Sequence, residues 1–285
     1  MNTTAEVLRY AAFDVAGEGG NPAGVVLDAR GLGEAKMLAI AAEVGYSETA
    51  FLVREGDSRR FDVRYFSPLA EVPFCGHATI ASAVAFALRE GVGDLLFRTP
   101  AGEVPVATGL VDGRVNATLT SVRPAVREAA EQDVEAALEA LRWQAGDLDP
   151  AMPPRVANAG ASHLVLAVAG RDRLAELDYD FDALGAVMAR CGWTTLQLVW
   201  RDGATGEFHA RDPFPPGGIY EDPATGAAAA AFGAYLRELA LVETPARIVI
   251  HQGADMGRPC RLVADIPAEA GTGISVSGTA TEIAA

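Results

Sequence analysis

The stretch that decides the fold is Arg64–Leu88, R-Y-F-S-P-L-A-E-V-P-F-C-G-H-A-T-I-A-S-A-V-A-F-A-L. It begins as a strand that ends at Ser67-Pro68, passes through a short loop to a Cys75-Gly76-His77 turn, and continues as an almost uncharged helix. A helix with so few charges is predicted to be buried on all sides. The first N–H groups of a helix are unpaired and attract anions, so polar residues at this strand-to-helix junction indicate a functional site.

The bulk composition limits the function classes. The chain has 285 residues, enough for two domains of ordinary size, and half of them are apolar. With 23 basic and 38 acidic residues its net charge is −15, which disfavours binding to nucleic acid. The N-terminus lacks the pattern of a signal peptide, and the longest apolar run, Ala227–Ala234, is too short to span a membrane. We therefore expect a cytoplasmic protein with no membrane partner.

Motifs for metals and cofactors are missing from the sequence. The three cysteines are far apart and form no C-x-x-C pair, so they predict neither a disulfide framework nor a zinc site. The four histidines show no i, i+4 pairing, and no metal site is expected. The glycine-rich stretch Gly17–Gly24 lacks the G-x-G-x-x-G register of a dinucleotide site. We expect no dinucleotide cofactor.

The second half of the chain repeats the order of elements in the first. In each half, the pattern predicts a strand, a helix, two more strands, a glycine turn and an apolar helix. The two apolar helices begin after Cys75-Gly76-His77 and after Asp222-Pro223-Ala224-Thr225-Gly226. A duplicated fold would point both helix N-termini into one cleft, although recurrence of this kind also arises by chance in α+β proteins. Residues 121–130, rich in Pro, Arg and Glu, are expected to form a linker.

Three polar residues at the edges of apolar elements are candidates for acid–base chemistry. Glu48 begins a strand that is otherwise apolar, and it is either solvated at the strand end or half-buried and able to move a proton. His77 either packs or caps its helix, or it orients an acid across a cleft. Asp222 precedes Pro223, so it is either the N-cap of the second apolar helix or a catalytic acid.

Cys75 and Thr225 each stand directly before the glycine of an apolar helix, so they occupy equivalent places in the two halves. A thiolate is stabilised at a helix N-terminus, and Cys75 is therefore a possible nucleophile or base. The alternative is a small buried hydrophobic residue. A racemase with two thiol bases would need a second cysteine at Thr225, which is missing here.

The order of several short motifs resembles the PhzF-like isomerases of phenazine biosynthesis, which have the diaminopimelate-epimerase fold. The motifs are N-P-A-G-V-V-L (21–27), S-E-T-A-F (47–51), R-Y-F-S-P (64–68), E-V-P-F-C-G-H-A-T (71–79), G-I-Y-E-D-P-A-T-G-A-A (218–228) and H-Q-G-A-D-M-G-R-P (251–259). Each motif is weak alone, but their order covers nearly the whole chain. In that family the serine of T-G-S-A follows the glycine, and this chain has Ala227 in its place.

The resemblance implies an α+β protein with two pseudo-symmetric domains, each a barrel-like, mostly antiparallel sheet around a central helix. We place the domains at residues 1–121 and 122–285, and leave open whether the last strand returns to the first domain. The resemblance implies a cofactor-free site between the domains and a homodimer. It assigns the catalytic roles to Glu48, His77 and Asp222.

The function predicted from these observations is a cofactor-independent isomerase that moves a proton on a small, possibly cyclic carboxylic acid through Glu48. The substrate carboxylate would be held by backbone amides at the two helix starts. The candidate substrate-binding residues are Asn21, Gly76, Gly226 and Ala227. Two alternatives stay open: an epimerase or dehydratase of an amino or hydroxy acid that uses Cys75, with Thr225 opposite, and a small-molecule-binding protein without catalysis.

Overall fold

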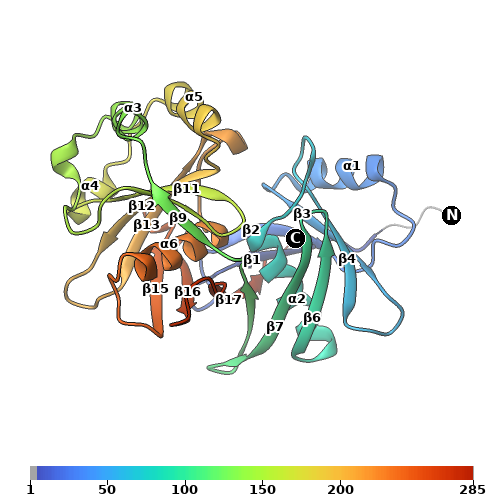
Figure 1. Cartoon of the computed structure of the whole chain (residues 1–285). Coiled ribbons are helices and arrows are strands. Elements are labelled where there is room, and N and C mark those ends of the chain that lie inside the picture. The colour runs from blue at the N-terminus through green and yellow to red at the C-terminus, as the bar shows by residue number, and fades with distance from the viewer. Residues whose placement is uncertain (1–4, 285) are drawn as a thin grey trace. The chain divides into compact units, whose positions relative to one another are not determined.

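A computed structural model describes residues 5–284 of the chain, which form two compact units (Figure 1). Unit 1 contains the described residues up to Thr120 together with those from Ser277 onward. Unit 2 contains Ser121–Val276. The final segment of the chain therefore belongs to the same unit as its beginning.

Eight strands of unit 1 form a closed barrel. Each strand pairs with the next in the order β1, β2, β3, β4, β6, β7, β8 and β17, and β17 pairs with β1 to close the ring. The pairs β2–β3 and β4–β6 are parallel. The bounds are β1 (Leu8–Ala12), β2 (Asn21–Val26), β3 (Thr49–Arg54), β4 (Arg60–Phe66), β5 (Glu71–Val72, paired with the end of β4), β6 (Gly93–Thr99), β7 (Gly102–Val111), β8 (Arg114–Thr120) and β17 (Ser275–Glu282).

Helix α2 (Gly76–Glu90) is the centre of unit 1. Every residue from His77 to Ala87 is buried, and the helix contacts β1, β2, β3, β7 and β8. Its many alanines allow strands to approach it from all sides, as the lack of charges predicts. Helix α1 (Glu34–Val44) contacts β3 and β4, and it ends at Gly45, whose φ of 71° suits glycine.

Unit 2 has the same plan around a second central helix. Helix α6 (Gly226–Glu238) is buried along nearly its whole length and contacts strands at both ends of the sheet. The sheet runs in the order β9, β10, β11, β12, β13, β15 and β16. The bounds are β9 (Ala125–Glu128), β10 (Arg155–Asn158), β11 (Ser162–Ala167), β12 (Thr195–Arg201), β13 (Phe208–Phe214), β14 (Ile219–Asp222, paired with β13), β15 (Ala246–Gln252) and β16 (Cys260–Ile266).

Three further helices of unit 2 cover its sheet, namely α3 (Glu131–Leu141), α4 (Arg171–Ala175) and α5 (Phe181–Cys191). They share a hydrophobic cluster with the strands, which includes Trp143, Leu166, Leu184 and Trp193. Short 3-10 turns lie at Ala145–Asp147, Pro215–Gly217 and Ala254–Met256. Within residues 5–284, no helix has the length and apolar character needed to cross a membrane.

The series of parallel and antiparallel strand pairs is the same in the two units. Strands β1, β2, β3, β4, β6 and β7 pair antiparallel, parallel, antiparallel, parallel and antiparallel in succession. Strands β10, β11, β12, β13, β15 and β16 repeat that series without change. The predicted fold of two similar barrel-like units, each with a central helix, is confirmed. The predicted linker at residues 121–130 is wrong in part, because β9 lies within it and pairs with β10.

Candidate active site

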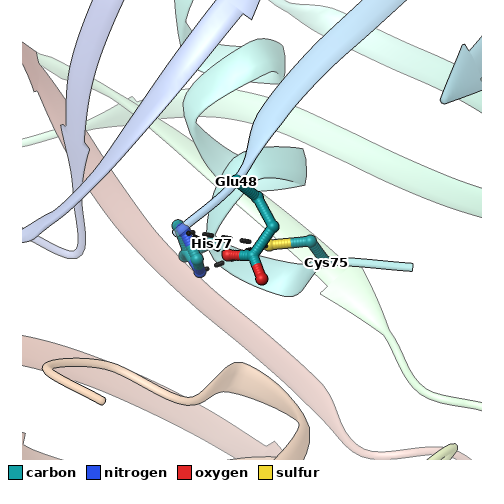
Figure 2. A group of neighbouring side chains, drawn as sticks. All are labelled: Glu48, Cys75 and His77. Atoms are coloured by element: carbon teal, nitrogen blue, oxygen red, sulfur yellow. Dashed lines mark hydrogen bonds and ion pairs between the residues drawn. The ribbon is translucent and has the colours of Figure 1, made fainter. Parts of the chain in front are cut away.

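The structure brings Glu48, Cys75 and His77 together at the start of α2 (Figure 2). Glu48 directly precedes β3, where its carbonyl accepts a hydrogen bond from the Gly24 amide at 3.1 Å. Cys75 is the N-cap residue of α2, with extended backbone, and His77 is the second residue of the helix. A parallel strand pair and a helix start therefore fix the three side chains.

The three side chains contact one another pairwise. The Cys75 Sγ lies 3.3 Å from Nδ1 and 3.8 Å from Nε2 of His77, and it donates to Glu48 Oε2 at 3.6 Å. His77 Nε2 lies 3.4 Å from Glu48 Oε2 and 3.4 Å from the hydroxyl of Ser47. The His77 side chain is 6% exposed and that of Glu48 is 15% exposed. Of the alternatives drawn from the sequence, the half-buried position is the one that the structure gives to Glu48.

This arrangement suits proton transfer. A carboxylate, an imidazole and a thiol can each hold or release a proton, and here each lies near both of the others. Glu48 is the most accessible of the three, so it is the group best placed to meet a ligand. His77 can orient the carboxylate through Nε2, and the Ser47 hydroxyl also lies at that nitrogen.

A hydrogen-bonded pair of buried hydroxyl groups, from Thr79 and Tyr65, contacts the backbone of the Cys75-Gly76-His77 turn. The Thr79 hydroxyl donates to the Cys75 carbonyl at 2.8 Å, and the Tyr65 hydroxyl lies 2.7 Å from Thr79 Oγ1. Burial raises the pKa of Tyr65, so its phenol stays neutral and serves as a hydrogen-bonding group. These residues were not identified from the sequence, although Thr79 lies in the quoted Cys-Gly-His motif.

In unit 2, Asp222 and Thr225 form a second polar cluster with Gln252. The Thr225 hydroxyl donates to Asp222 Oδ2 at 2.7 Å. The Gln252 amide donates to the Asp222 carbonyl at 2.8 Å and to Thr225 Oγ1 at 3.1 Å, and it accepts from the Thr225 backbone at 3.1 Å. The N-cap of α6 is Thr225, so the alternative in which Asp222 caps the helix is wrong. Gln252 lies in the segment 251–259, but sequence reasoning gave it no role.

A deeper layer of unit 2 buries a carboxyl group and a histidine. Asp212 accepts from the Thr195 hydroxyl at 3.1 Å, and the Gln197 side chain, with its nitrogen toward Asp212, donates to both carboxyl oxygens at 2.9 and 3.1 Å. Burial first, and the neighbouring Asp222 second, raise the pKa of Asp212. The His163 Nδ1 lies 2.8 Å from Thr195 Oγ1, and burial lowers the pKa of His163 to about 3. None of these four residues was predicted.

The remaining predicted residues lie at the ends of elements. Gly76 and Gly226 are the first residues of α2 and α6, and Ala227 follows Gly226. Asn21 is buried at the start of β2, opposite Ala12. A surface cavity of about 310 Å³ in unit 1 lies elsewhere and is lined by charged residues such as Arg54 and Glu90.

The Glu48, Cys75 and His77 side chains also form a possible metal-binding group. One donor atom from each lies within 4.8 Å of the other two. No metal site was predicted, because the four histidines show no i, i+4 pairing. Such spacing does not consider Glu48, a donor that directly precedes β3 and lies far from Cys75 and His77 along the chain.

Comparison with known proteins identifies the family. The family model described as phenazine biosynthesis-like protein matches residues 10–285. The chain belongs to this family. An uncharacterized isomerase of Bacillus subtilis, YfhB, is 30% identical over 98% of this chain and 96% of its own length. The trans-2,3-dihydro-3-hydroxyanthranilate isomerase of Pseudomonas aeruginosa is 30% identical over 86% of this chain and 84% of its own length.

A solved structure of this family has the same fold over nearly the whole chain. The PhzF-family phenazine biosynthesis protein of Bacillus anthracis superimposes with a TM-score of 0.89 at 25% identity, covering 98% of this chain and 97% of that one. The predicted membership of the PhzF-like family and its diaminopimelate-epimerase-like fold are confirmed. The relatives named isomerase also support the prediction that the chain is an isomerase of this family.

Proposed function

We propose that the chain is a cofactor-independent isomerase that shifts a proton between two carbons of a small carboxylic acid, with Glu48 as the base. The single observation that carries this proposal is the contact of Glu48 with His77 and Cys75 at the helix start. Glu48 is the most exposed of the three, and a carboxylate held by a neighbouring imidazole is a competent proton shuttle.

The proposed step balances without any other reactant. The Glu48 carboxylate takes a proton from an activated carbon, and the electron pair of the broken C–H bond moves into the conjugated system of the substrate. The same carboxyl group then returns the proton to a different carbon on the same face. His77 orients Glu48 through the 3.4 Å contact. General acid–base catalysis of this kind contributes about 10²–10⁴-fold.

We propose that the substrate carboxylate binds at a helix start. The unpaired N–H groups at Gly76-His77 and Gly226-Ala227 carry the positive ends of α2 and α6. Such groups explain how a chain with a net charge of −15 can bind an anion. Asp222 would accept a substrate hydroxyl or amine while its Oδ2 is held by Thr225. Asn21 and Ala227 are further proposed contacts of the substrate.

The test follows deuterium incorporation by NMR in D₂O, with a panel of small unsaturated and cyclic carboxylic acids that includes trans-2,3-dihydro-3-hydroxyanthranilate. We expect exchange at a carbon with at least one member. Glu48→Gln should slow this exchange by about 10²–10⁴-fold. Glu43→Gln, which changes an exposed carboxylate on α1, is the matched control and should exchange like the wild type. Exchange at the wild-type rate in Glu48→Gln would show that another group is the base.

A second candidate function rests on the contact between Cys75 Sγ and His77 Nδ1 at 3.3 Å. An imidazole at this distance can take the thiol proton and generate a thiolate base, as an epimerase or dehydratase would require. In the Glu48 mechanism, Cys75→Ala should retain exchange within about tenfold of wild type, since it removes only a neighbouring group. A loss of about 10²-fold or more, with Glu48→Gln still active, would instead assign the base to Cys75.

This chain has Ala227 where the family motif has serine. The substrate of the Pseudomonas relative is therefore tested as one member of a wider panel and not alone. A ligand that binds but never exchanges a carbon-bound proton would favour the third reading, a binding protein without catalysis. The cytoplasmic location and the homodimer stay predictions, and gel filtration with light scattering tests the second.

A further inference from the structure

The Glu48, Cys75 and His77 group has the dimensions of a metal site. The donor atoms Cys75 Sγ, His77 Nε2 and Glu48 Oε2 are separated by 3.8 Å for sulfur to nitrogen, 3.4 Å for nitrogen to oxygen and 3.6 Å for sulfur to oxygen. Tetrahedral zinc, with its usual bond lengths to sulfur, nitrogen and oxygen, requires separations of about 3.6, 3.4 and 3.6 Å respectively. The three observed separations are of the size that three tetrahedral ligands require, but Nδ1 of the same ring is closer to the sulfur, at 3.3 Å, so the His77 ring must rotate to direct its Nε2 lone pair at a cation shared with Sγ.

The charge of the group suits a divalent cation. A Cys75 thiolate, a Glu48 carboxylate and a neutral His77 together carry two negative charges, which a divalent cation would neutralise. Such neutralisation matters because all three side chains are largely shielded from solvent, and an uncompensated charge there is costly. The sulfur and nitrogen donors select borderline and soft cations such as Zn²⁺ and Cd²⁺ over Mg²⁺.

We propose that Cys75, His77 and Glu48 bind one zinc-type divalent cation, which inhibits the protein by occupying its proton-transfer groups. On binding, the cation forms bonds to Sγ, Nε2 and Oε2, and the thiol proton is released to solvent. The Glu48 carboxylate is then a ligand and no longer a base. The inhibition rests on the proposed function, whereas the binding itself does not.

The first experiment uses Cd²⁺ alone, added to the metal-free protein without substrate. Thiolate-to-cadmium charge transfer gives an ultraviolet absorption that reports sulfur ligation directly. We expect a single equivalent of Cd²⁺ to saturate this signal, competition by Zn²⁺, and no competition by Mg²⁺. Cys75→Ala should abolish the signal. His77→Ala and Glu48→Gln should each weaken binding by about tenfold or more, the scale of even indirect changes at metal sites.

The other two cysteines supply matched controls. Cys260 is buried and donates to the Arg258 carbonyl, and Cys191 lies at the end of α5, outside the group. Cys191→Ser and Cys260→Ser should keep the full signal. Circular dichroism and thermal unfolding confirm that each variant is folded, and Cys75→Ser provides a conservative second variant that should also lose the charge-transfer band.

Two results would overturn the site. One is an absence of stoichiometric Cd²⁺ binding by the wild type. The other is binding that survives in Cys75→Ala, which would indicate surface carboxylates on this acidic chain. Inhibition is tested separately, as loss of deuterium exchange on addition of Zn²⁺ and recovery with EDTA. Saturating Cd²⁺ binding combined with undiminished exchange would refute inhibition alone, while a protein that never exchanges would refute the proposed function and leave the metal site standing.

Discussion

The two units share a backbone plan but carry different chemistry at equivalent places. Arg64 in β4 lies opposite Phe51 in β3, and Arg211 in β13 lies opposite Leu198 in β12. Phe51 and Leu198 therefore occupy equivalent positions in the two units. Glu48 and Thr195, which lie three residues before them along the chain, are equivalent too. At the helix starts, Cys75-Gly76-His77 corresponds to Thr225-Gly226-Ala227. Unit 1 thus has an acid, a thiol and an imidazole where unit 2 has two hydroxyls and a methyl group.

Unit 2 instead places carboxyl groups where unit 1 has none. Asp212 and Asp222 lie opposite each other in β13 and β14, and the corresponding pair in β4 and β5 is Tyr65 and Val72. The two units thus keep a glycine helix start in common, while the titratable groups beside it differ. This difference predicts that equivalent substitutions in the two units have unequal effects.

The largest difference is expected at the two arginine–glutamate pairs. Arg211 and Glu221 form a two-point ion pair that is almost fully buried, at 8% and 2% exposure, with contacts of 2.9 and 2.5 Å. The counterpart in unit 1, Arg64 with Glu71, is 34% and 29% exposed. Removing one partner of a buried pair leaves an uncompensated charge and costs about 3–5 kcal/mol. An exposed pair contributes about 0–1 kcal/mol.

We therefore expect Glu221→Gln to lower the free energy of unfolding by about 3–5 kcal/mol and Glu71→Gln by at most about 1 kcal/mol. Urea denaturation at neutral pH measures both, and Arg211→Met combined with Glu221→Gln should recover part of the loss. Equal losses in the two single variants would contradict the view that burial distinguishes the pairs.

The second difference is His163 in β11, a buried histidine of unit 2. The equivalent strand of unit 1, β2, contains no histidine. Burial lowers the pKa of His163 to about 3, and its Nε2 has no hydrogen-bond partner among the described residues. The unfolded chain takes up this proton near the ordinary pKa of 6.5. The folded state therefore binds fewer protons between pH 6.5 and 3, and the contribution of His163 to stability is lost progressively as pH falls through that window.

We expect the wild type to lose stability relative to His163→Asn by about 1.4 kcal/mol for each pH unit below 6, or roughly 2 kcal/mol at pH 5. Asparagine keeps a polar atom near the position of Nδ1, which contacts Thr195, and does not titrate. Thermal unfolding of both proteins from pH 7 to pH 4.5 gives the difference. A constant difference across this range would mean that His163 takes up its proton at the same pH in the folded and unfolded chains, so that burial does not lower its pKa.

Sequence reasoning located the elements of unit 1 better than the polar interior of unit 2. The Cys75-Gly76-His77 turn was found because local signals and a family motif coincide at a helix start. Glu48 was singled out because a carboxylate at the start of an apolar strand is conspicuous. By contrast, His163 and Asp212 lie on different strands, and Thr195 on a third strand links them. Their contact depends on strand register, which the spacing of residues along the chain does not reveal.

The burial of Asp212 and the short strand β9 were also not predicted from the sequence. Asp212 lies in E-F-H-A-R-D-P-F on the same face of β13 as the buried Phe208 and Ala210, where a carboxylate is not expected. Strand β9 has four mostly exposed residues, A-V-R-E, too few to show a period. Asp222 was considered as a helix cap because Pro223 follows it, but the helix begins only after Thr225.

The smallest difference concerns Asp212 and its counterpart Tyr65. Both are fully buried, and burial together with the nearby Asp222 raises the pKa of Asp212 well above its ordinary value, whereas the Tyr65 phenol stays neutral. The unfolded chain ionises near 3.8, so the folded state binds more protons above that pH, and stability falls as pH rises through the raised pKa of Asp212. Asp212 thus costs stability at neutral pH.

We expect Asp212→Asn to raise the free energy of unfolding by about 1 kcal/mol at pH 8, with the gain shrinking toward pH 4. The Gln197 amide can turn its oxygen to the new amide, so packing is kept. Tyr65→Phe, which removes a hydroxyl that stays neutral, should show a pH-independent change. If Asp212 positions Asp222 for the proposed reaction, the stabilised variant should also lose about tenfold in exchange rate, as is typical where a site stores strain. A variant that is more stable and fully active would leave Asp212 as a purely structural residue.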